Sequence, residues 1–408
     1  MHGIEHKNID IKRSVTPTPS PPQPPQPPQP IPGGVRVRYI LPSIKGLHEP
    51  VYRTEYYAKG ANVTTYPPLP TIPDNRLEFD RYTHTLQELA DLQQDIDVGV
   101  VLKTVDGKSY LDFILTPTIG LTVGISFQID GASTFRIDWG DGSYNDYSES
   151  NTSLHTYSNY SDYTIIIERI SGSGTLFFNA DFGTNIQKSI TNIYIGNFTN
   201  FGNYTFSNCH SLRSVVIPNG ITSISSNSFK ECFSLRSVII PNSVKSINDY
   251  AFTSCRTLYS VVIPNNVTSI NDVTFSECTL LSAIVIPNSV ISISNYVFSH
   301  CTSLQSVIIQ NNVTNIGVLA FSNCVSLRSI IVPNSVTNIN AYAFANCYSL
   351  TSYTFLSIVP PIISLATFDN ITPIAKIYVP DASVAAYKVA TNWMYFADKI
   401  FPLSEKPE

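Results

Sequence analysis

The chain has 408 residues, enough for roughly two to four domains that each hold their own hydrophobic core. Its net charge of −5 at pH 7 and its pI near 5.8 argue against a nucleic-acid-binding protein, which would carry a basic surface. No run of residues approaches the roughly 18 consecutive apolar side chains of a membrane-spanning helix.

The first 34 residues predict a peptide and a stalk. Residues 1–15, MHGIEHKNIDIKRSV, are polar and lack the apolar centre of a secretory signal, so we expect an anchoring peptide on a chain that folds in the cytosol. Residues 16–34, TPTPSPPQPPQPPQPIPGG, favour an extended polyproline II rod of roughly 50 Å, because proline fixes φ. A disordered tail without a function is the alternative to this stalk.

Residues 35–105 contain short β-strand patterns. The segment RTEYY at 53–57 and Gly60 fit a hairpin, and FDRY at 79–82 fits a later strand. This order resembles the Listeria–Bacteroides repeat of surface proteins, although the final glycine and tryptophan of its "F-x-G-W" strand are missing here. The resemblance implies a small β-grasp-like domain that acts as a spacer or a binding module.

Residues 106–180 predict a β-sandwich. The alternation from Phe135 to Trp139 fits a half-buried strand, and Gly140-Asp141-Gly142 fits a tight hairpin turn. The sequences WGDG at 139–142 and HTY at 155–157, followed by Tyr163, resemble the signature of PKD-like domains.

Asp138, Asp141 and Asp146 surround this turn and could serve as calcium ligands. Their spacing is not that of an EF-hand loop, and aspartate is common in turns for conformational reasons. We therefore expect no cofactor, with Ca²⁺ near these three carboxylates as the alternative. We expect His155 to be a hydrogen-bonded structural residue and not a base.

Residues 181–357 repeat one pattern every 23 residues. CFSLRSVIIPNSVKSINDYAF begins at Cys232, and CRTLYSVVIPNNVTSINDVTF begins at Cys255. Such self-similarity is the signature of a solenoid. The positions that recur, and that we expect in the solenoid core, include Cys209, Cys232, Cys255, Cys278, Cys301, Cys324, Cys347, Phe229, Phe252, Phe275, Leu235 and Leu258.

One copy is enough to predict the path of a coil. Residues 237–240, SVII, predict a short strand that ends at Pro241-Asn242. Val244 and Ile247 then face the core, and residues 248–252 lead into a brief helical or 3₁₀ segment. Stacked coils place equivalent residues about 4.8 Å apart, so each apolar position forms a ladder.

The seven cysteines suit the core better than disulfides or a metal site. Their number is odd, and the spacing offers no CxxC pair with attendant histidines for zinc. Cysteine is small and often buried, so we expect reduced residues in contact with the neighbouring coil. A ladder of free thiols fits a chain that folds in a reducing compartment.

The repeat resembles the BspA-type leucine-rich repeat over residues 204–350, because the length of the unit and its Cys, Leu, Pro and Phe positions all agree. Residues 372–400 resemble the closing cap of such proteins, with Tyr378-Val379-Pro380, Tyr387 and Trp393 over the last coil. We assign the cap to residues 358–408. The resemblance implies surface display and adhesion or recognition.

No motif for catalysis is recognisable in the sequence, and we expect no enzymatic activity. GxxxxGK[ST], HExxH and GxSxG are absent, and the histidines are scattered. Asp249 and Asp272 share a position in adjacent copies, which indicates a turn and not a catalytic pair. The candidate ligand surface holds tyrosines that we place at varying repeat positions: Tyr250, Tyr259, Tyr296, Tyr342 and Tyr348. The alternative is that uncharged polar residues only keep the solenoid soluble.

The sequence as a whole predicts a mainly β, multi-domain adhesin. Because no secretory signal is recognised, we expect a phage virion appendage of the head- or tail-fibre type, attached to a capsid or tail protein through residues 1–15. Strings of such domains also resemble those of phage fibre-like adhesins. The alternative is a bacterial cell-surface adhesin of the BspA type. In both cases the solenoid binds a surface glycan or protein, and a homo-oligomer is compatible with the sequence, although no heptad specifies one.

Overall fold

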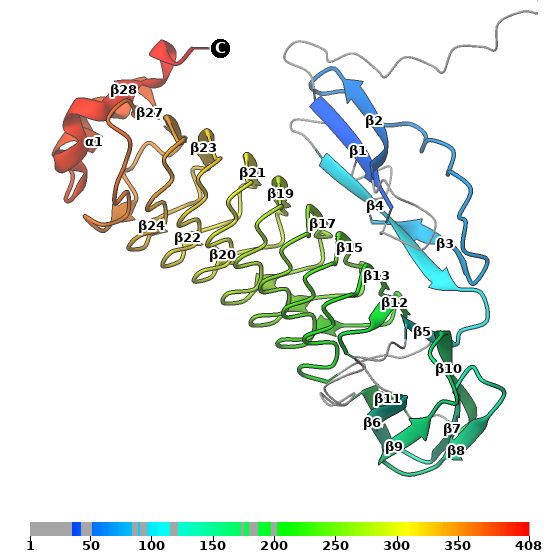
Figure 1. Ribbon diagram of the computed structural model, residues 1–408. Helices are drawn as coiled ribbons and strands as arrows, with labels where there is room; N and C mark the ends of the chain where they lie inside the picture. The colour runs from blue at the N-terminus through cyan, green and yellow to red at the C-terminus, as the bar shows by residue number, and fades with distance from the viewer. Residues whose placement is uncertain are drawn as a thin grey trace, which may run out of the picture.

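The computed structural model describes residues 35–41, 51–83, 89, 96–114, 121–172, 175–178, 187–196 and 202–407. The expected anchoring peptide and stalk, residues 1–34, lie outside the described residues. Figure 1 shows a small β domain, a β-sandwich and a long solenoid that ends in a cap of short helices. The fold is mainly β, and the 23-residue repeat predicted from the sequence is confirmed as a solenoid coil.

The first domain is a four-stranded mixed sheet in the order β2-β1-β4-β3. Strands β1 and β2 pair antiparallel, β1 and β4 pair parallel, and β3 and β4 pair antiparallel. In β1, Val35, Val37 and Tyr39 alternate with more exposed residues and form a small core with Val63 and Leu89. The strands are β1 (Val35–Ile40), β2 (Val51–Tyr57), β3 (Leu77–Tyr82) and β4 (Ile96–Thr104).

The sandwich consists of two facing sheets. The larger sheet has the order β13-β12-β5-β10-β7-β8, and the smaller has the order β11-β6-β9. Trp139, Phe135 and Phe127 are fully buried between them, as the alternating pattern of the strands requires. The strands are β5 (Ser109–Ile114), β6 (Thr122–Asp130), β7 (Ser133–Asp138), β8 (Tyr144–Tyr147), β9 (Asn151–Thr156), β10 (Asp162–Gly172) and β11 (Thr175–Phe178).

The larger sheet continues from the sandwich into the solenoid. Strand β12 (Ile190–Tyr194) pairs antiparallel with β5, and on its other side it pairs parallel with β13 (Ser214–Val216). Gly196 lies so close to the backbone of Gly107 and Lys108 that a Cβ atom there would stand 2.1 Å from the Gly107 oxygen. The first coil is therefore joined to the sandwich by a continuous sheet across the domain boundary expected at residues 180/181.

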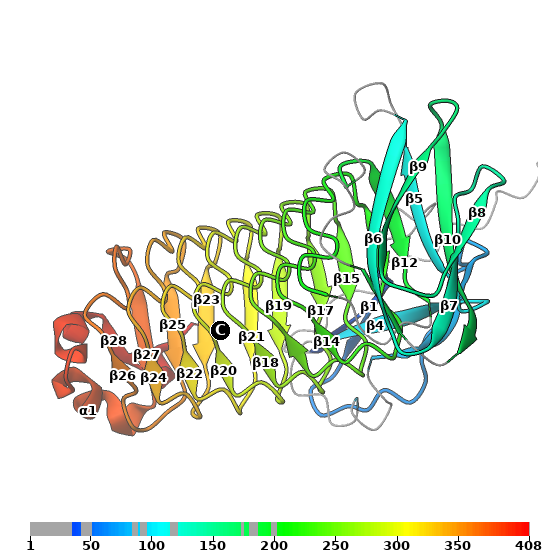
Figure 2. The same ribbon diagram turned by 90° about the horizontal axis from the view of Figure 1, so that it is seen from below.

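Each coil of the solenoid contributes one longer and one shorter strand, and the shorter ones form a seven-stranded parallel sheet. Figure 2 shows the coils stacked in steps between the sandwich and the cap. The longer strands are β13, β15 (Ser237–Ile239), β17 (Ser260–Val262), β19 (Ala283–Ile286), β21 (Ser306–Ile309), β23 (Ser329–Val332), β25 (Ser352–Phe355) and β27 (Lys376–Val379). The shorter strands are β14 (Ser223–Ile224), β16 (Ser246–Ile247), β18 (Ser269–Ile270), β20 (Ser292–Ile293), β22 (Asn315–Ile316), β24 (Asn338–Ile339) and β26 (Ile362–Ile363).

The prediction that residues 248–252 lead into a helical or 3₁₀ segment with Phe252 and Cys255 is wrong. The chain forms consecutive turns there, because two residues of the coil adopt left-handed backbone conformations, Tyr250 at φ 59° and Ser254 at φ 59°. A left-handed residue interrupts a right-handed helix. The same pair of left-handed positions recurs in the coils on either side, at Asn227 and Glu231 and at Val273 and Glu277.

A cap covers the last coil. The indole nitrogen of Trp393 donates to the Pro361 carbonyl at 2.7 Å, and the Tyr387 hydroxyl donates to the Ser357 carbonyl at 2.9 Å. Both side chains are fully buried. They therefore close the end of the core, as a solenoid requires. The cap elements are η1 (Asp381–Ser383), α1 (Val384–Val389), η2 (Trp393–Lys399), β28 (Ile400–Pro402) and η3 (Leu403–Glu405).

The first domain lies along the outer face of the longer strands at the start of the solenoid, as Figure 1 shows. Ile40 is fully buried against Ile239 of β15 and Val262 of β17. The adjacent Leu41 packs in a cluster with Val216 of β13. The domain therefore covers apolar side chains that the solenoid directs away from its own core.

Candidate binding surface of the solenoid

The core residues of the solenoid form ladders that fix the position of every surface side chain. The Phe252 and Phe275 rings are stacked with their centroids 5.5 Å apart and an interplanar angle of 3°. The next pair, Phe275 and Phe298, repeats this geometry at 5.7 Å and 5°. Phe229, Leu235 and Leu258 are likewise fully buried. Equivalent surface residues in successive coils are therefore arranged in straight rows.

All seven cysteines are free and buried. Each thiol from Cys232 onward donates to the carbonyl of the phenylalanine in the preceding coil, as in Cys255 to Phe229 at 3.1 Å and Cys278 to Phe252 at 3.3 Å. Burial raises the pKa of Cys301 to about 12 and that of Cys232 well above its usual value. These thiols are protonated hydrogen-bond donors inside the core and are not placed to act as nucleophiles.

Asp249 and Asp272 hold one edge of neighbouring coils together. Asp249 Oδ1 accepts a hydrogen bond from the Asp272 backbone N–H at 3.2 Å, and Asp272 Oδ1 accepts one from the Asn295 N–H at 2.9 Å. Asn295 continues the series by accepting from the Val318 N–H at 2.9 Å. The two carboxylates therefore satisfy backbone donors of the next coil, which is a structural role.

The predicted placement of the tyrosines at varying positions is wrong for three of them. Tyr250, Tyr296 and Tyr342 occupy the same left-handed position in their coils, and Tyr204 occupies it as well. The four are spaced by 46 residues, which is two coils, and each is 41–48% exposed. A search for 23-residue periodicity misses them, because a 46-residue period is visible only when alternate coils are compared.

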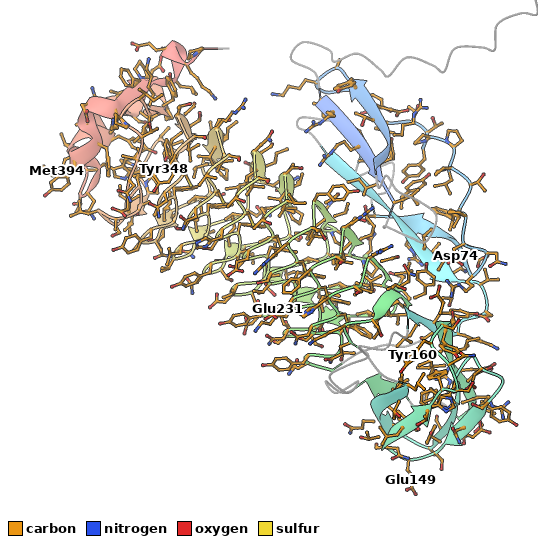
Figure 3. The ribbon with its side chains drawn as sticks, in the orientation of Figure 1. Asp74, Glu149, Tyr160, Glu231, Tyr348 and Met394 are labelled. Atoms are coloured by element: carbon orange, nitrogen blue, oxygen red, sulfur yellow. The ribbon has the colours of Figure 1, made fainter. Side chains whose placement is uncertain are left out.

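The other two tyrosines lie elsewhere. Tyr259 precedes β17 on the side of the longer strands and is half-buried. Tyr348 is 59% exposed, and its hydroxyl donates to Asn346 Oδ1 at 3.2 Å. Figure 3 labels Tyr348 near the cap, on the far part of the solenoid from the sandwich. These two residues do not extend the row formed by the other four.

An apolar strip on the longer strands was not anticipated from the sequence. Val285 of β19 and Ile308 of β21 are paired in register and half-buried, and Ile331 of β23 is 48% exposed. They continue the line of Ile239 and Val262, which the first domain covers. Each of these strands carries apolar residues on both of its faces, and the sequence does show them. A short run of β-branched residues, however, does not show which of them face outward.

Each of the three candidate calcium ligands in the sandwich is hydrogen-bonded to a nearby residue, in or beside the turn at residues 138–146. Asp138 Oδ1 accepts from the Gly140 N–H at 2.9 Å, and Asp146 pairs with Arg136 at 2.7 and 2.8 Å. Asp141 Oδ1 accepts from the Ser143 N–H at 3.0 Å. Among the described residues no group of three or more His, Cys, Asp or Glu side chains could hold a metal ion. The absence of a cofactor remains the prediction, with Ca²⁺ at this turn as its alternative.

His155 belongs to the same turn. Its Nε2 lies 2.7 Å from Asp141 Oδ2, and its ring stacks on Trp139 with a centroid separation of 4.8 Å. Burial raises the pKa of Asp141, but the hydrogen bonds from Ser143 and His155 outweigh it and hold the pKa below the usual value. The histidine thus links the turn to the core of the sandwich.

The model of the BspA-type leucine-rich repeat region matches residues 184–301 and 268–390, with six copies. Together these matches span half of the chain. The chain belongs to the BspA-type leucine-rich repeat family. No curated protein matches its sequence.

Several solved structures of leucine-rich repeat proteins resemble the chain. A leucine-rich cell surface protein from Faecalibacterium prausnitzii is 23% identical, with 45% of this chain and 70% of that one covered and a TM-score of 0.24. A protein from Bacteroides ovatus is 20% identical over 61% of this chain and 90% of its own, with a TM-score of 0.24. A leucine-rich repeat protein from T. pallidum is 21% identical over 52% of this chain and 80% of its own, with a TM-score of 0.30.

No helix among the described residues is long and apolar enough to cross a membrane.

Proposed function

We propose that this protein is a non-enzymatic adhesin of the bacterial cell surface, which binds glycans or proteins through its solenoid. The observation that carries the proposal is the surface of the coils, where rows of uncharged side chains repeat along the solenoid. Tyr250 and Tyr296 lie in one such row, and the exposed Asn288 and Asn311 lie in another. Exposed tyrosine and asparagine suit recognition surfaces, because they combine contact area with adaptable hydrogen bonds.

Membership of the BspA-type family supports the cell surface over the virion. The expected phage appendage depends on residues 1–15 and 16–34, which lie outside the described residues. It remains a prediction, together with the PKD-like and Listeria–Bacteroides-like assignments and the capsid or tail partner.

A non-enzymatic role is supported by the hydrogen bonds that two carboxylates accept in the described coils. Asp249 and Asp272, which share a position in adjacent coils, both accept hydrogen bonds from backbone N–H groups. A glycoside hydrolase would instead need two carboxyl groups that flank a sugar.

The location is tested with antibodies raised against the solenoid, applied to intact and to permeabilised cells of the source culture and to purified phage particles. Labelling of intact cells is expected. Labelling of permeabilised cells alone would overturn the proposal, and labelling of phage particles but not of cells would favour the virion appendage.

Binding is tested by flow cytometry of the fluorescent full chain on cells from the same environment. Binding should be lost after the cells are treated with periodate if the ligand is a glycan, or with protease if it is a protein. A chain that binds none of these cells would contradict the adhesin function.

A further inference from the structure

The row of exposed tyrosines has a period of its own. Tyr204, Tyr250, Tyr296 and Tyr342 lie 46 residues apart, all at φ values of 58–62°. The rows formed by the core phenylalanines repeat every coil, whereas this one repeats every second coil. The surface of the solenoid therefore carries a repeat unit that is twice as long as the unit of its core.

The intervening coils carry smaller side chains at the position that holds tyrosine in the row. Asn227, Val273 and Leu319 occupy the same position in the intervening coils. Asn227 is 9% exposed, against 48% for Tyr204 and 41% for Tyr250 on either side of it. A phenol ring thus projects at every second coil, with less exposed side chains in between. No position of the row from Tyr204 to Tyr342 carries a charge.

The backbone conformation gives no reason for tyrosine at these positions. A left-handed φ disfavours bulky side chains, and asparagine tolerates it better. The second left-handed position of the coil holds asparagine in three coils, at Asn208, Asn323 and Asn346, and no tyrosine in the others. The tyrosines of the row form no hydrogen bond with another described side chain through their hydroxyls, and each is 41–48% exposed. What they contribute is an aromatic surface.

The spacing of the row restricts the shape of its ligand. Phenylalanine rings of successive coils stand 5.2–5.7 Å apart along the core. Equivalent side chains two coils apart are therefore separated by about 10–11 Å. That separation is comparable to the length of two sugars in an extended β-1,4-linked chain, in which alternate residues present the same face. The C–H groups on a β-linked pyranose ring form an apolar face that packs on an aromatic ring.

We propose that the row Tyr204, Tyr250, Tyr296 and Tyr342 binds an extended β-1,4-linked polysaccharide, with one tyrosine to each disaccharide. This inference rests on the proposed adhesin function and names its ligand class. A protein partner fits less well, because protein interfaces concentrate their binding energy in a compact central cluster and not in a row of equal spacing. A neutral row also suits a ligand whose polar groups are hydroxyls.

The test measures binding of the full chain to three β-1,4-linked hexasaccharides, cellohexaose, xylohexaose and chitohexaose, by isothermal titration calorimetry. Maltohexaose, which is α-1,4-linked and coiled, serves as the comparison. At least one β-linked hexasaccharide should bind more tightly than both its own trisaccharide and maltohexaose, because a hexasaccharide spans several rings.

The variants remove the rings without changing the backbone preference. Tyr250→Asn and Tyr296→Asn each introduce the residue that Asn227 already places at this position, so the fold should be retained. Each substitution should weaken binding about two- to tenfold, and the double variant by the product. Tyr250→Phe should bind like the original chain. Tyr395→Asn, which changes a 67% exposed tyrosine of the cap, is the matched control and should have no effect.

Three results would overturn the proposal: no β-linked hexasaccharide binds, maltohexaose binds equally well, or the double variant binds as tightly as the original chain. If the double variant still adheres to cells as well as the original chain does, this inference fails while the adhesin function stands. Adhesion that is sensitive to protease and independent of the row would identify a protein partner instead. A chain that adheres to no cells fails the adhesin function itself.

Discussion

The sandwich and the solenoid bury their side chains in different ways. In the solenoid, Phe275 contacts Phe252 and Phe298, which are the same residue in the neighbouring coils. In the sandwich, Trp139 has partners that occur once, with its ring stacked on His155 and its Nε1 donating to Asn145 Oδ1 at 2.9 Å. One local arrangement is reused along the solenoid, whereas every contact of the sandwich must be specified separately.

The two regions are nevertheless joined by the strand pairs β5–β12 and β12–β13 and by one continuous hydrophobic core. The chain has two tryptophans, and they report on opposite ends of this core. Trp139→Phe leaves Trp393 as the reporter of the capped end of the solenoid. Trp393→Phe leaves Trp139 as the reporter of the sandwich. Urea unfolding of the two variants therefore separates the stability of the two regions.

The stabilities of the solenoid and of the sandwich should differ most when the pH rises above 9, because only the solenoid contains thiols. Burial raises the pKa of Cys301 and of Cys347 from 9.0 to about 12. The folded chain therefore binds more protons than the unfolded chain between these values. The thiols' contribution to stability is fully present below pH 9 and falls as the pH rises through this window, by about 1 kcal/mol per thiol and pH unit.

The urea midpoint reported by Trp393 should accordingly fall between pH 9 and pH 10, and the midpoint reported by Trp139 should fall less. Cys301→Ala removes one buried thiol and should reduce the pH slope of the Trp393 midpoint. A Trp393 midpoint that does not change over this range would show that the thiols do not stabilise the coils in this way.

The next largest effect is expected for Phe275→Ala, which interrupts the phenylalanine ladder in the middle of the solenoid. The ring is fully buried, so its removal should lower the free energy of unfolding reported by Trp393 by about 3–5 kcal/mol. Leu280→Ala changes a 49% exposed side chain of the same coil and should alter it by less than about 0.5 kcal/mol. Equal losses for the two variants would mean that the ladder is not the source of stability.

The smallest effect is expected for Tyr157→Phe in the sandwich. The Tyr157 hydroxyl is buried and donates to the Trp139 carbonyl at 2.8 Å. Its loss leaves that acceptor without this donor and should lower the stability reported by Trp139 by about 1–2 kcal/mol. Tyr160→Phe, at a residue that is 48% exposed, is the control and should leave the midpoint unchanged. A shift of the Trp393 midpoint as large as that of Trp139 would show that the two regions unfold as one unit.

The 23-residue period by itself determined the solenoid and its interior. Positions such as Cys255 and Phe252 recur because stacked coils bring each residue against its own equivalents, so a pattern along the sequence is also a pattern in space. That is why the solenoid and its repeat could be predicted from residue spacing alone. The same reasoning failed for the turns at Tyr250, because left-handed residues there are not glycine and give no local signal.

Only the tertiary structure decided how the regions are joined and what each surface presents. The pairing of β5 with β12 connects Leu111 with Ile193, and the burial of Ile40 against Ile239 and Val262 places the first domain on the solenoid. Such contacts link residues far apart in the chain and follow from complementary surfaces that have no periodicity. The alternate-coil row of tyrosines is likewise a property of the stacked coils, since neither residue type nor the 23-residue period shows which side chains project from the surface.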